Sequence, residues 1–568
     1  MVVSLTTTPM LCALLLRPQQ GQRHGRLYRG SEWVFDAVLA RYMASLSWVL
    51  RHPLLMLSAT LATIVLTVSL YLYIPKTLFP QQDTGRLIGN ILADQNASAQ
   101  SMRALIAQFA ASVSEDPAVQ TVIAVSGGQG GGPANNGRFF VTLKPLEERK
   151  LGVDQVIGRL RGKLAVIPGA TLFLQPVLDL RTGGRRSNAQ YQYTLWGDDL
   201  NELSTWSTTM LNKMRTLRGL ADVNTDQMNS GLQSDLTIDR QTAERLGISA
   251  QSVDATLYDA FGQRQVSTMY LPLNQYHVVM EMEPNMWQDP SGLDYVRVRA
   301  ADGSLVPLSV FSRYKADTTA LQVNHSGQFP SVTISFNLLA GFALGDAVDE
   351  ITDAAAQSGM PASIFPSFSG TAQAFQESLA NEGLLIAAAI ATVYIVLGML
   401  YENLIHPITI ISTLPSAGVG ALLALLAFKT DLSIIAFIGI ILLIGIVKKN
   451  AILMIDFAID VQRREGRSAA DSIYEACHMR FRPIMMTTMS ALFGGLPLAL
   501  GQGIGAELRQ PLGIAIVGGL LFSQALTLYT TPVIYLYLDR LRAFLDRRRQ
   551  GRRSSPAQAS PSTSVAQT

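Results

Sequence analysis

The chain has 568 residues, of which 48% are hydrophobic and only 15% are charged. A soluble protein of this size usually carries about 25% charged residues, so the composition indicates a membrane protein with a soluble part and excludes a wholly soluble enzyme. The net charge of +3 gives no support for a nucleic-acid partner, and the two cysteines, Cys12 and Cys477, form neither a disulfide framework nor a metal-ligand spacing.

Six apolar runs are long enough to cross a membrane as helices, which takes about 20 residues each. A seventh run, at the N-terminus, is too short to span. It lacks the basic start and small-residue exit of a signal peptide, so we interpret it as the second half of a transmembrane helix. The six runs are Leu54–Ile74, Gly383–Tyr401, Pro407–Phe428, Leu432–Ala458, Pro483–Leu500 and Leu512–Leu538.

Arginine-rich segments predict the orientation, because positively charged loops stay on the cytoplasmic side. They lie at residues 17–51, 463–482 and 540–553. These segments share one side of the membrane if every candidate helix spans it, which places the large region between Ile74 and Gly383 outside. The low-complexity end, SSPAQASPSTSVAQT, is typical of a disordered cytoplasmic tail.

The outer region shows the order β-α-β-β-α-β twice, which is the split-βαβ, ferredoxin-like pattern. Two such units side by side create a cleft, and clefts between domains often bind ligands. The alternative, that the two units only pack together, stays open. Expected strands are 87–93, 119–126, 139–145 and 171–177 in the first unit, and 190–195, 232–240, 331–337 and 363–368 in the second, with an insertion at about 247–324.

A glycine-rich stretch, SGGQGGGPANNG, joins two strands of the first unit. A phosphate-binding loop would need G-x-x-x-x-G-K-[ST], which is absent. We interpret the stretch as a mobile loop beside the cleft, with a plain connector as the alternative. The six histidines form no metal-ligand spacing, and no G-x-S-x-G occurs, so the sequence predicts neither a metal site nor an enzyme. The loop glycines are Gly127, Gly128, Gly131 and Gly132.

Two adjacent lysines, Lys448 and Lys449, interrupt the apolar run that begins at Leu432. A lysine near a bilayer centre costs roughly 2.5–3.5 kcal/mol, and such residues tend to serve ion pathways or pair with an acid. The alternative is that the side chain reaches the cytoplasmic interface. For Lys449, which is deeper and is followed by the polar Asn450, we favour a functional role. The membrane runs contain hardly any acids to pair with it.

Several motifs together resemble the C-terminal half of the resistance–nodulation–division (RND) multidrug efflux transporters of the hydrophobe/amphiphile class. The resemblance covers nearly all of residues 1–542, and some phrases resemble a subunit type of heteromeric pumps. The motifs are SLTTTPMLC, IPKTLFPQQDTG, FFVTLKPLEER, AFGQRQVSTMY, TLPSAGVGALLAL, IGIVKKNAILMIDFA and RFRPIMMTT.

The resemblance implies a polytopic α-helical membrane protein with a large periplasmic α+β region, made of two ferredoxin-like porter subdomains and an inserted docking subdomain. The expected parts are a partial sixth transmembrane helix (1–16), a cytoplasmic link with an amphipathic helix (17–52), a transmembrane helix (53–75), porter subdomain 1 (82–182), porter subdomain 2 (188–246 and 325–372), the docking subdomain (247–324), five transmembrane helices (380–540) and a basic, disordered tail (541–568).

Such pumps are inner-membrane trimers that need no cofactor, because the proton gradient drives export of drugs, detergents or bile-salt-like amphiphiles. The expected partners are these substrates, the missing N-terminal half or a partner RND subunit, a periplasmic adaptor and an outer-membrane channel, in a homo- or heterotrimer. Without the other half, we expect the chain to be unable to transport. The competing hypothesis is a membrane binding module that lacks proton coupling.

The resemblance also implies roles for single residues. Lys449 would pair with acids on a helix of the other half, and Arg480 and Thr487 would join it in a proton relay, together with Asn450. Departures from the family concern the glycine-rich loop, which has no aromatic residue here, and Ile123, which stands where the best-known pumps have Phe. The substrate-binding candidates are Phe140, Phe173 and Asp179, with core packing or a surface charge as the alternative for each.

Overall fold

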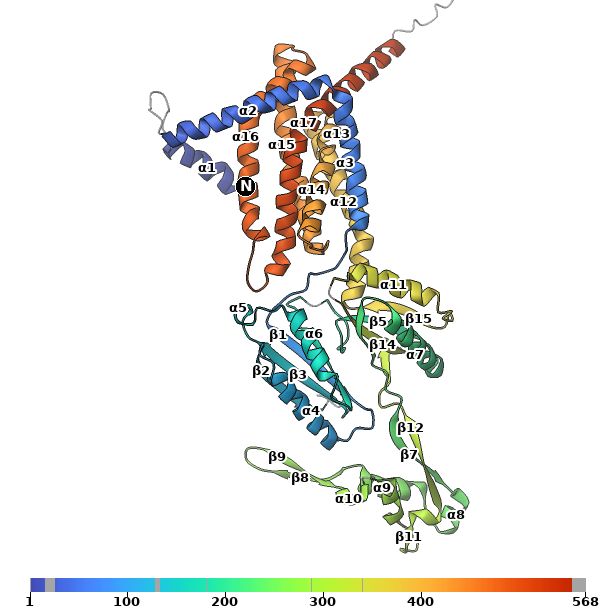
Figure 1. Ribbon diagram of the computed structural model, residues 1–568. Coiled ribbons are helices and arrows are strands. Elements are labelled where there is room, and N and C mark those ends of the chain that lie inside the picture. Colours follow the sequence, from blue (N-terminus) through green and yellow to red (C-terminus); the bar gives the residue numbers. More distant parts are fainter. Residues whose placement is uncertain are drawn as a thin grey trace, which may run out of the picture. The chain divides into compact units, whose positions relative to one another are not determined.

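A computed structural model of the chain describes residues 2–15, 26–127, 133–180, 182–287, 289–339 and 341–553. Residues 128–132 of the predicted glycine-rich loop and the low-complexity tail beyond residue 553 lie outside the described residues. The chain divides into two compact units (Figure 1). One unit is a helical bundle and the other is an α+β region, as the sequence predicts. The bundle comprises Met1–Gln82, Ala343–Asp346 and Ala374–Thr568, and the α+β unit comprises Asp83–Phe342 and Ala347–Gln373.

Five helical segments of the described chain are long and apolar enough to cross a membrane. They coincide with five of the six predicted runs. The sixth, Pro483–Leu500, lies in α16 (Ala469–Ala499), whose Thr, Ser, Gly and Pro residues lower its hydropathy. Nevertheless α16 packs along α15 and α17 in the bundle. The five are α3 (Pro53–Tyr73), α12 (Thr371–Tyr401), α13 (His406–Ile411) with α14 (Leu414–Ala427), α15 (Ile434–Glu465) and α17 (Ala506–Arg553).

Proline and glycine shape the bundle locally. The helix break between α13 and α14 precedes Pro415, which lacks the N–H that would continue the helix. Close packing of α14 against α17 depends on glycine, since a Cβ on Gly420 would lie 2.6 Å from the carbonyl oxygen of Gly518. Small residues of this kind let membrane helices approach each other closely.

Two further helices precede the first span. The helix α1 (Val2–Leu15) is apolar and short, and α2 (Arg26–Arg51) packs against α16 and α17. Tyr42 fixes α2 in place, because its hydroxyl donates to the carbonyl of Leu528 at 2.9 Å and its ring stacks on Phe481 with centroids 4.9 Å apart.

The first sheet of the α+β unit has the antiparallel order β2-β3-β1-β4, which is the ferredoxin-like order. Along β1, buried residues alternate with half-buried ones, and the buried side packs with α4 and α6 into one core that includes Phe109 and Phe139. The opposite face carries no helix of this core. The elements are β1 (Arg86–Ala93), α4 (Ala99–Ser114), β2 (Val119–Ser126), β3 (Asn136–Leu143), α5 (Leu146–Arg149), α6 (Val153–Leu164) and β4 (Ala170–Pro176).

The second sheet repeats this arrangement with one correction to the expectation. The predicted strand 232–240 forms as β7 (Gly231–Ile238) but pairs with β12 (Ser312–Thr319) outside the sheet, and β6 (Leu220–Thr225) takes its place beside β14. The residues of β7 are mostly exposed, which suits a two-stranded ribbon and not a sheet over a core. The remaining elements are β5 (Tyr191–Trp196), α7 (Leu200–Thr216), β13 (Asn324–Ser326), β14 (Phe329–Leu338), α11 (Leu344–Ala356) and β15 (Phe365–Ser369).

The β7–β12 ribbon leads to an inserted part with its own small core around Val253, Val298 and Phe311. From it extends a hairpin, β8–β9, whose strands pair with each other (Figure 1). Its tip is apolar and fully exposed at Leu273. The elements are α8 (Arg240–Arg245), α9 (Ala250–Phe261), β8 (Arg264–Tyr270), β9 (Gln275–Met280), α10 (Pro284–Trp287), η1 (Pro290–Tyr295), β10 (Arg297–Arg299), β11 (Leu305–Pro307) and η2 (Leu308–Val310).

Candidate functional site

Lys449 lies midway along α15, about 23 Å from either end at a rise of about 1.5 Å per residue. Its side chain is exposed, and so are the apolar side chains of Ile438 and Leu442 on the same helix face. A Cβ on Gly445 of this face would meet no atom within 4 Å. One face of a membrane-spanning helix, with a charge at its centre, is therefore left uncovered by the described part of the chain.

Arg480 and Thr487 lie on the neighbouring helix α16. The guanidinium of Arg480 sits 4.8 Å above the ring of Phe457 on α15, and its buried Nε has no hydrogen-bond partner among the described residues. The Thr487 hydroxyl donates to the carbonyl of Ile484 in its own helix at 3.1 Å. Lys449 forms no ion pair with any described residue. Three of the four relay candidates, Lys449, Arg480 and Thr487, thus lie on adjacent helices, and no hydrogen bond or ion pair between described residues joins them.

Asn450 faces the interior of the helix bundle. Consecutive residues of a helix do not share a face, so Asn450 is buried where Lys449 is exposed. Its side-chain amide donates to the Thr488 hydroxyl and to the Gln524 carbonyl oxygen, both at 3.0 Å. Thr488 in turn donates to Gln524 at 2.8 Å. Asn450 therefore joins α15, α16 and α17 and does not lie with the exposed lysine.

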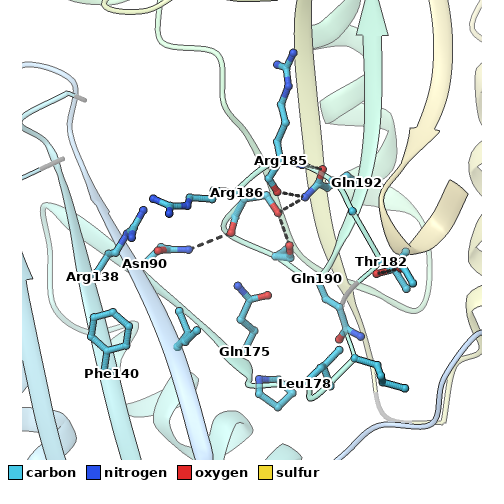
Figure 2. Close-up of a pocket in the computed structure, with 18 residues that line it drawn as sticks. Asn90, Arg138, Phe140, Gln175, Leu178, Thr182, Arg185, Arg186, Gln190 and Gln192 are labelled. Atoms are coloured by element: carbon cyan, nitrogen blue, oxygen red, sulfur yellow. Dashed lines mark hydrogen bonds between the residues drawn. The ribbon is translucent and has the colours of Figure 1, made fainter. Parts of the chain in front are cut away.

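A pocket of about 300 Å³ lies on the open face of the first sheet (Figure 2). Cross-strand pairing explains which side chains reach it, because directly opposed residues share a face. Ile88 of β1 is opposite Phe140 of β3 and Gln175 of β4, and Asn90 is opposite Arg138. All five line the pocket, and the segment between β4 and β5 forms its other wall.

Hydrogen bonds to both sheets hold this connecting segment. Gln192 of β5 donates to the carbonyl of Arg185 at 2.6 Å and accepts from its N–H at 3.1 Å. Asn90 of β1 donates to the carbonyl of Ser187 at 3.1 Å. Gly184 has φ of +87°, and a Cβ there would lie 3.1 Å from both Gln192 Oε1 and the Cα of Gly370, so this turn requires glycine.

The substrate candidates are placed differently with respect to this pocket. Phe140 lines it and is 43% exposed. Phe173 is opposite Asn90 and so shares its face, but it is buried and is not part of the lining. Asp179 is exposed between two lining residues, Leu178 and Leu180. Of the loop glycines, only Gly127 is described, with φ of +87°, and the other three lie outside the described residues.

No motif or spacing in the sequence points to the pocket's arginines, Arg138, Arg185 and Arg186. Arg138 lies within a strand, which alone does not indicate a binding role. Arg185 and Arg186 lie in a loop that contains no recognisable motif. Arg185 also acts on Asp226, whose carboxylate accepts from the N–H of Thr333 at 2.7 Å. Burial raises the pKa of Asp226 above its ordinary value, and the Thr333 hydrogen bond and the Arg185 charge partly offset this.

Comparison with known proteins gives a family match and close relatives. The model of the AcrB/AcrD/AcrF family matches residues 1–539. The "Multidrug resistance protein MdtC" of Serratia proteamaculans is 56% identical over 541 residues, which cover 95% of this chain and 52% of that protein. The MdtC protein of Escherichia coli O157:H7 is 52% identical over 548 residues, covering 96% and 53%. The chain therefore spans about half the length of these relatives.

The fold also matches a solved structure, that of a heavy metal efflux pump. Its TM-score is 0.80 at 24% sequence identity, with 94% of this chain and 54% of that chain covered. Identity at this level supports the shared fold alone. No group of three or more His, Cys, Asp or Glu residues that could hold a metal ion occurs in the described ranges.

Proposed function

Because this chain belongs to the AcrB/AcrD/AcrF family of RND transporters, we infer that it supplies the C-terminal half of a proton-driven exporter. It is a multi-pass protein of the bacterial inner membrane and belongs to a transporter family, not to an enzyme family. The inferred cargo is amphiphilic small molecules, including drugs, detergents and bile-salt-like compounds. The name of the relatives, which refers to multidrug resistance, supports the drugs in this group, and the family resemblance supports the rest.

The observation that carries the proposal is the exposed Lys449 at the centre of α15. A bare ammonium facing lipid is costly, so a carboxylate from outside the described residues is expected to pair with it. Protonation of that carboxylate would weaken the pairing and change how the helices pack. We propose that Arg480 and Thr487, on the adjacent α16, take part when a further helix covers this face.

The exposed hairpin β8–β9 supports an oligomer. Its apolar tip residues, Leu271 at 57% exposure and Leu273 at 101%, have no core of their own to pack on. A second subunit that receives the hairpin would bury them, which fits a homo- or heterotrimer. A periplasmic adaptor and an outer-membrane channel complete the proposed assembly on the strength of the family resemblance.

A second candidate function is a membrane binding module without proton coupling. It is favoured by one observation: the pocket around Phe140 is built by this chain alone, whereas Lys449 has no acidic partner within the described residues. In this case the chain would capture amphiphiles but export none.

A resistance assay separates the two functions. The chain would be joined to the N-terminal half of the Serratia proteamaculans relative and produced in a drug-sensitive bacterium that lacks its own pumps. We expect the joined protein to restore growth in taurocholate, and Lys449→Met to abolish this while leaving the amount of membrane-inserted protein unchanged. The chain on its own should not restore growth. Equal growth with the joined protein and its Lys449→Met variant would refute proton coupling through this residue.

A further inference from the structure

The described lining of the pocket on the open face of the first sheet has positive charge and no negative charge, and Asp179, between Leu178 and Leu180, is not part of that lining. Arg138, Arg185 and Arg186 line it, and its described lining contains no Asp or Glu. Like charges that share a site repel each other, and an opposite charge nearby favours the charged form of each. The pocket is therefore suited to an anion.

Arg138 and Arg186 approach the same space from opposite walls. Figure 2 shows their side chains extending toward each other across the pocket. Neither guanidinium forms an ion pair or a side-chain hydrogen bond with the part of the chain that the structure describes. Guanidinium groups bind carboxylate, sulfonate and phosphate oxygens through two parallel N–H donors, so the pair offers several donors to one anionic group.

The backbone on either side of this pair is fixed before any ligand arrives. Arg138 lies in β3, paired with Asn90. Arg186 lies between Arg185 and Ser187, whose carbonyls accept from Gln192 and Asn90 respectively. A site whose backbone is already ordered loses less entropy on binding than a flexible one.

Arg185 behaves differently from its neighbour. Its side chain points away from the pocket in Figure 2, and its charge acts on the half-buried Asp226. Arg185 thus has a counter-charge, whereas the two facing arginines form no ion pair with any residue that the structure describes. Substitution of Arg185 therefore serves as a matched control for substitution of Arg186, its neighbour in the chain.

An apolar wall adjoins the two arginines. Phe140 is 43% exposed and Leu180 is 44% exposed, and Ile88 lies opposite Phe140 on the neighbouring strand. A volume of about 300 Å³ lies at the lower end of the range for small-molecule sites. It is large enough for the charged head and the adjoining part of an apolar body.

We propose that Arg138 and Arg186 form an anion-selecting subsite that binds the carboxylate, sulfonate or phosphodiester head of an amphiphile, while its apolar body lies along Phe140 and Leu180. The inference rests on the proposed exporter function for its biological meaning. The preferred substrates would then be anionic, and Arg138 and Arg186 would select them.

Equilibrium dialysis tests the proposal on the full chain in nanodiscs of phosphatidylcholine, without a proton gradient. The probes are taurocholate, which carries a sulfonate, and BIGCHAP, which has the same steroid body with an uncharged head. A third probe, water-soluble dihexanoyl phosphatidylglycerol, presents the phosphodiester of a lipid. The variants are Arg138→Met, Arg186→Met and the control Arg185→Met, each with matched loss of one charge.

We expect the dissociation constant of taurocholate to rise about tenfold or more in Arg138→Met and Arg186→Met. It should change less than threefold in Arg185→Met, and BIGCHAP should bind all four proteins alike. The same pattern with the phosphatidylglycerol probe alone would assign the subsite to lipid headgroups. Equal taurocholate and phosphatidylglycerol binding by all four proteins, or an equal loss in Arg185→Met, would overturn the proposal. Because no transport is measured, a failure of export would leave this result intact.

Discussion

Replacing Asn450 with alanine should destabilise the helix bundle without stopping proton coupling. The side-chain amide of Asn450 donates two hydrogen bonds at 3.0 Å, to Thr488 on α16 and Gln524 on α17. Alanine removes both and leaves the bond between Thr488 and Gln524 in place. The change therefore loosens α15 from its two neighbours at one point near the centre of the helix.

The expected magnitude follows from the environment of these bonds. Hydrogen bonds between membrane helices contribute about 0.6 kcal/mol on average and at most about 1.7 kcal/mol. Two such bonds predict a loss of about 1–2 kcal/mol in the free energy of unfolding. The matched control is Thr487→Ala, whose hydroxyl bonds to Ile484 in its own helix and joins no two helices, so its effect should stay below about 0.5 kcal/mol.

Denaturation of the purified chain in mixed micelles with increasing dodecyl sulfate measures the free energy, and helix content by circular dichroism reports unfolding. A double-mutant cycle with Gln524→Ala should show that the two losses are not additive, because the residues share a bond. If Asn450→Ala left the stability unchanged but abolished export in the joined protein, Asn450 would belong with the relay and the packing role derived from its contacts would be refuted.

Two further changes test the α+β unit. Gly184→Ala forces a Cβ to within 3.1 Å of Gln192 Oε1 at a φ of +87°, so we expect it to displace the connecting segment and weaken taurocholate binding severalfold, while Gly183→Ala, which meets no atom within 4 Å, controls for backbone strain alone. Asp226→Asn tests the raised pKa. The folded state holds this proton more tightly than the unfolded state, so the contribution of Asp226 to stability is full below about its ordinary value of 3.8 and is lost as the pH rises through the folded pKa. As the pH rises from 3.5, the melting temperature of the wild type should therefore fall relative to that of Asp226→Asn. Parallel plots of melting temperature against pH for the two proteins would contradict the raised pKa.

The sequence predicted those parts of the fold that carry a strong local pattern. The apolar runs became helices, and β2 has the predicted bounds, because both signals depend on residues close together in the chain. The second sheet was predicted with the wrong strand, since β6 is a six-residue segment of mixed polarity whereas β7 looks like a sheet strand until its partner is known. Which strand joins a sheet depends on long-range pairing that no local pattern encodes.

The candidate sites divide in the same way. A lysine within an apolar run can be seen in the sequence, whereas its exposure on one helix face is seen only in the structure. The contacts of Asn450 depend on which neighbours α15 meets, so the sequence grouped it with Lys449, although Asn450 is buried against α16 and Lys449 is exposed. Arg138 and Arg186 come to line the same pocket only when the segment after β4 folds over the first sheet. Neither residue belongs to a sequence motif.

Substrate-driven proton movement through the joined protein tests the central claim most directly. The protein would be reconstituted in proteoliposomes with a pH gradient, and a trapped pH-sensitive dye would report proton flux when taurocholate is added. We expect taurocholate to accelerate proton flux in the wild type, and Lys449→Met to abolish the acceleration while taurocholate binding stays within twofold. Acceleration of the same size in Lys449→Met would contradict a role for this lysine in proton coupling.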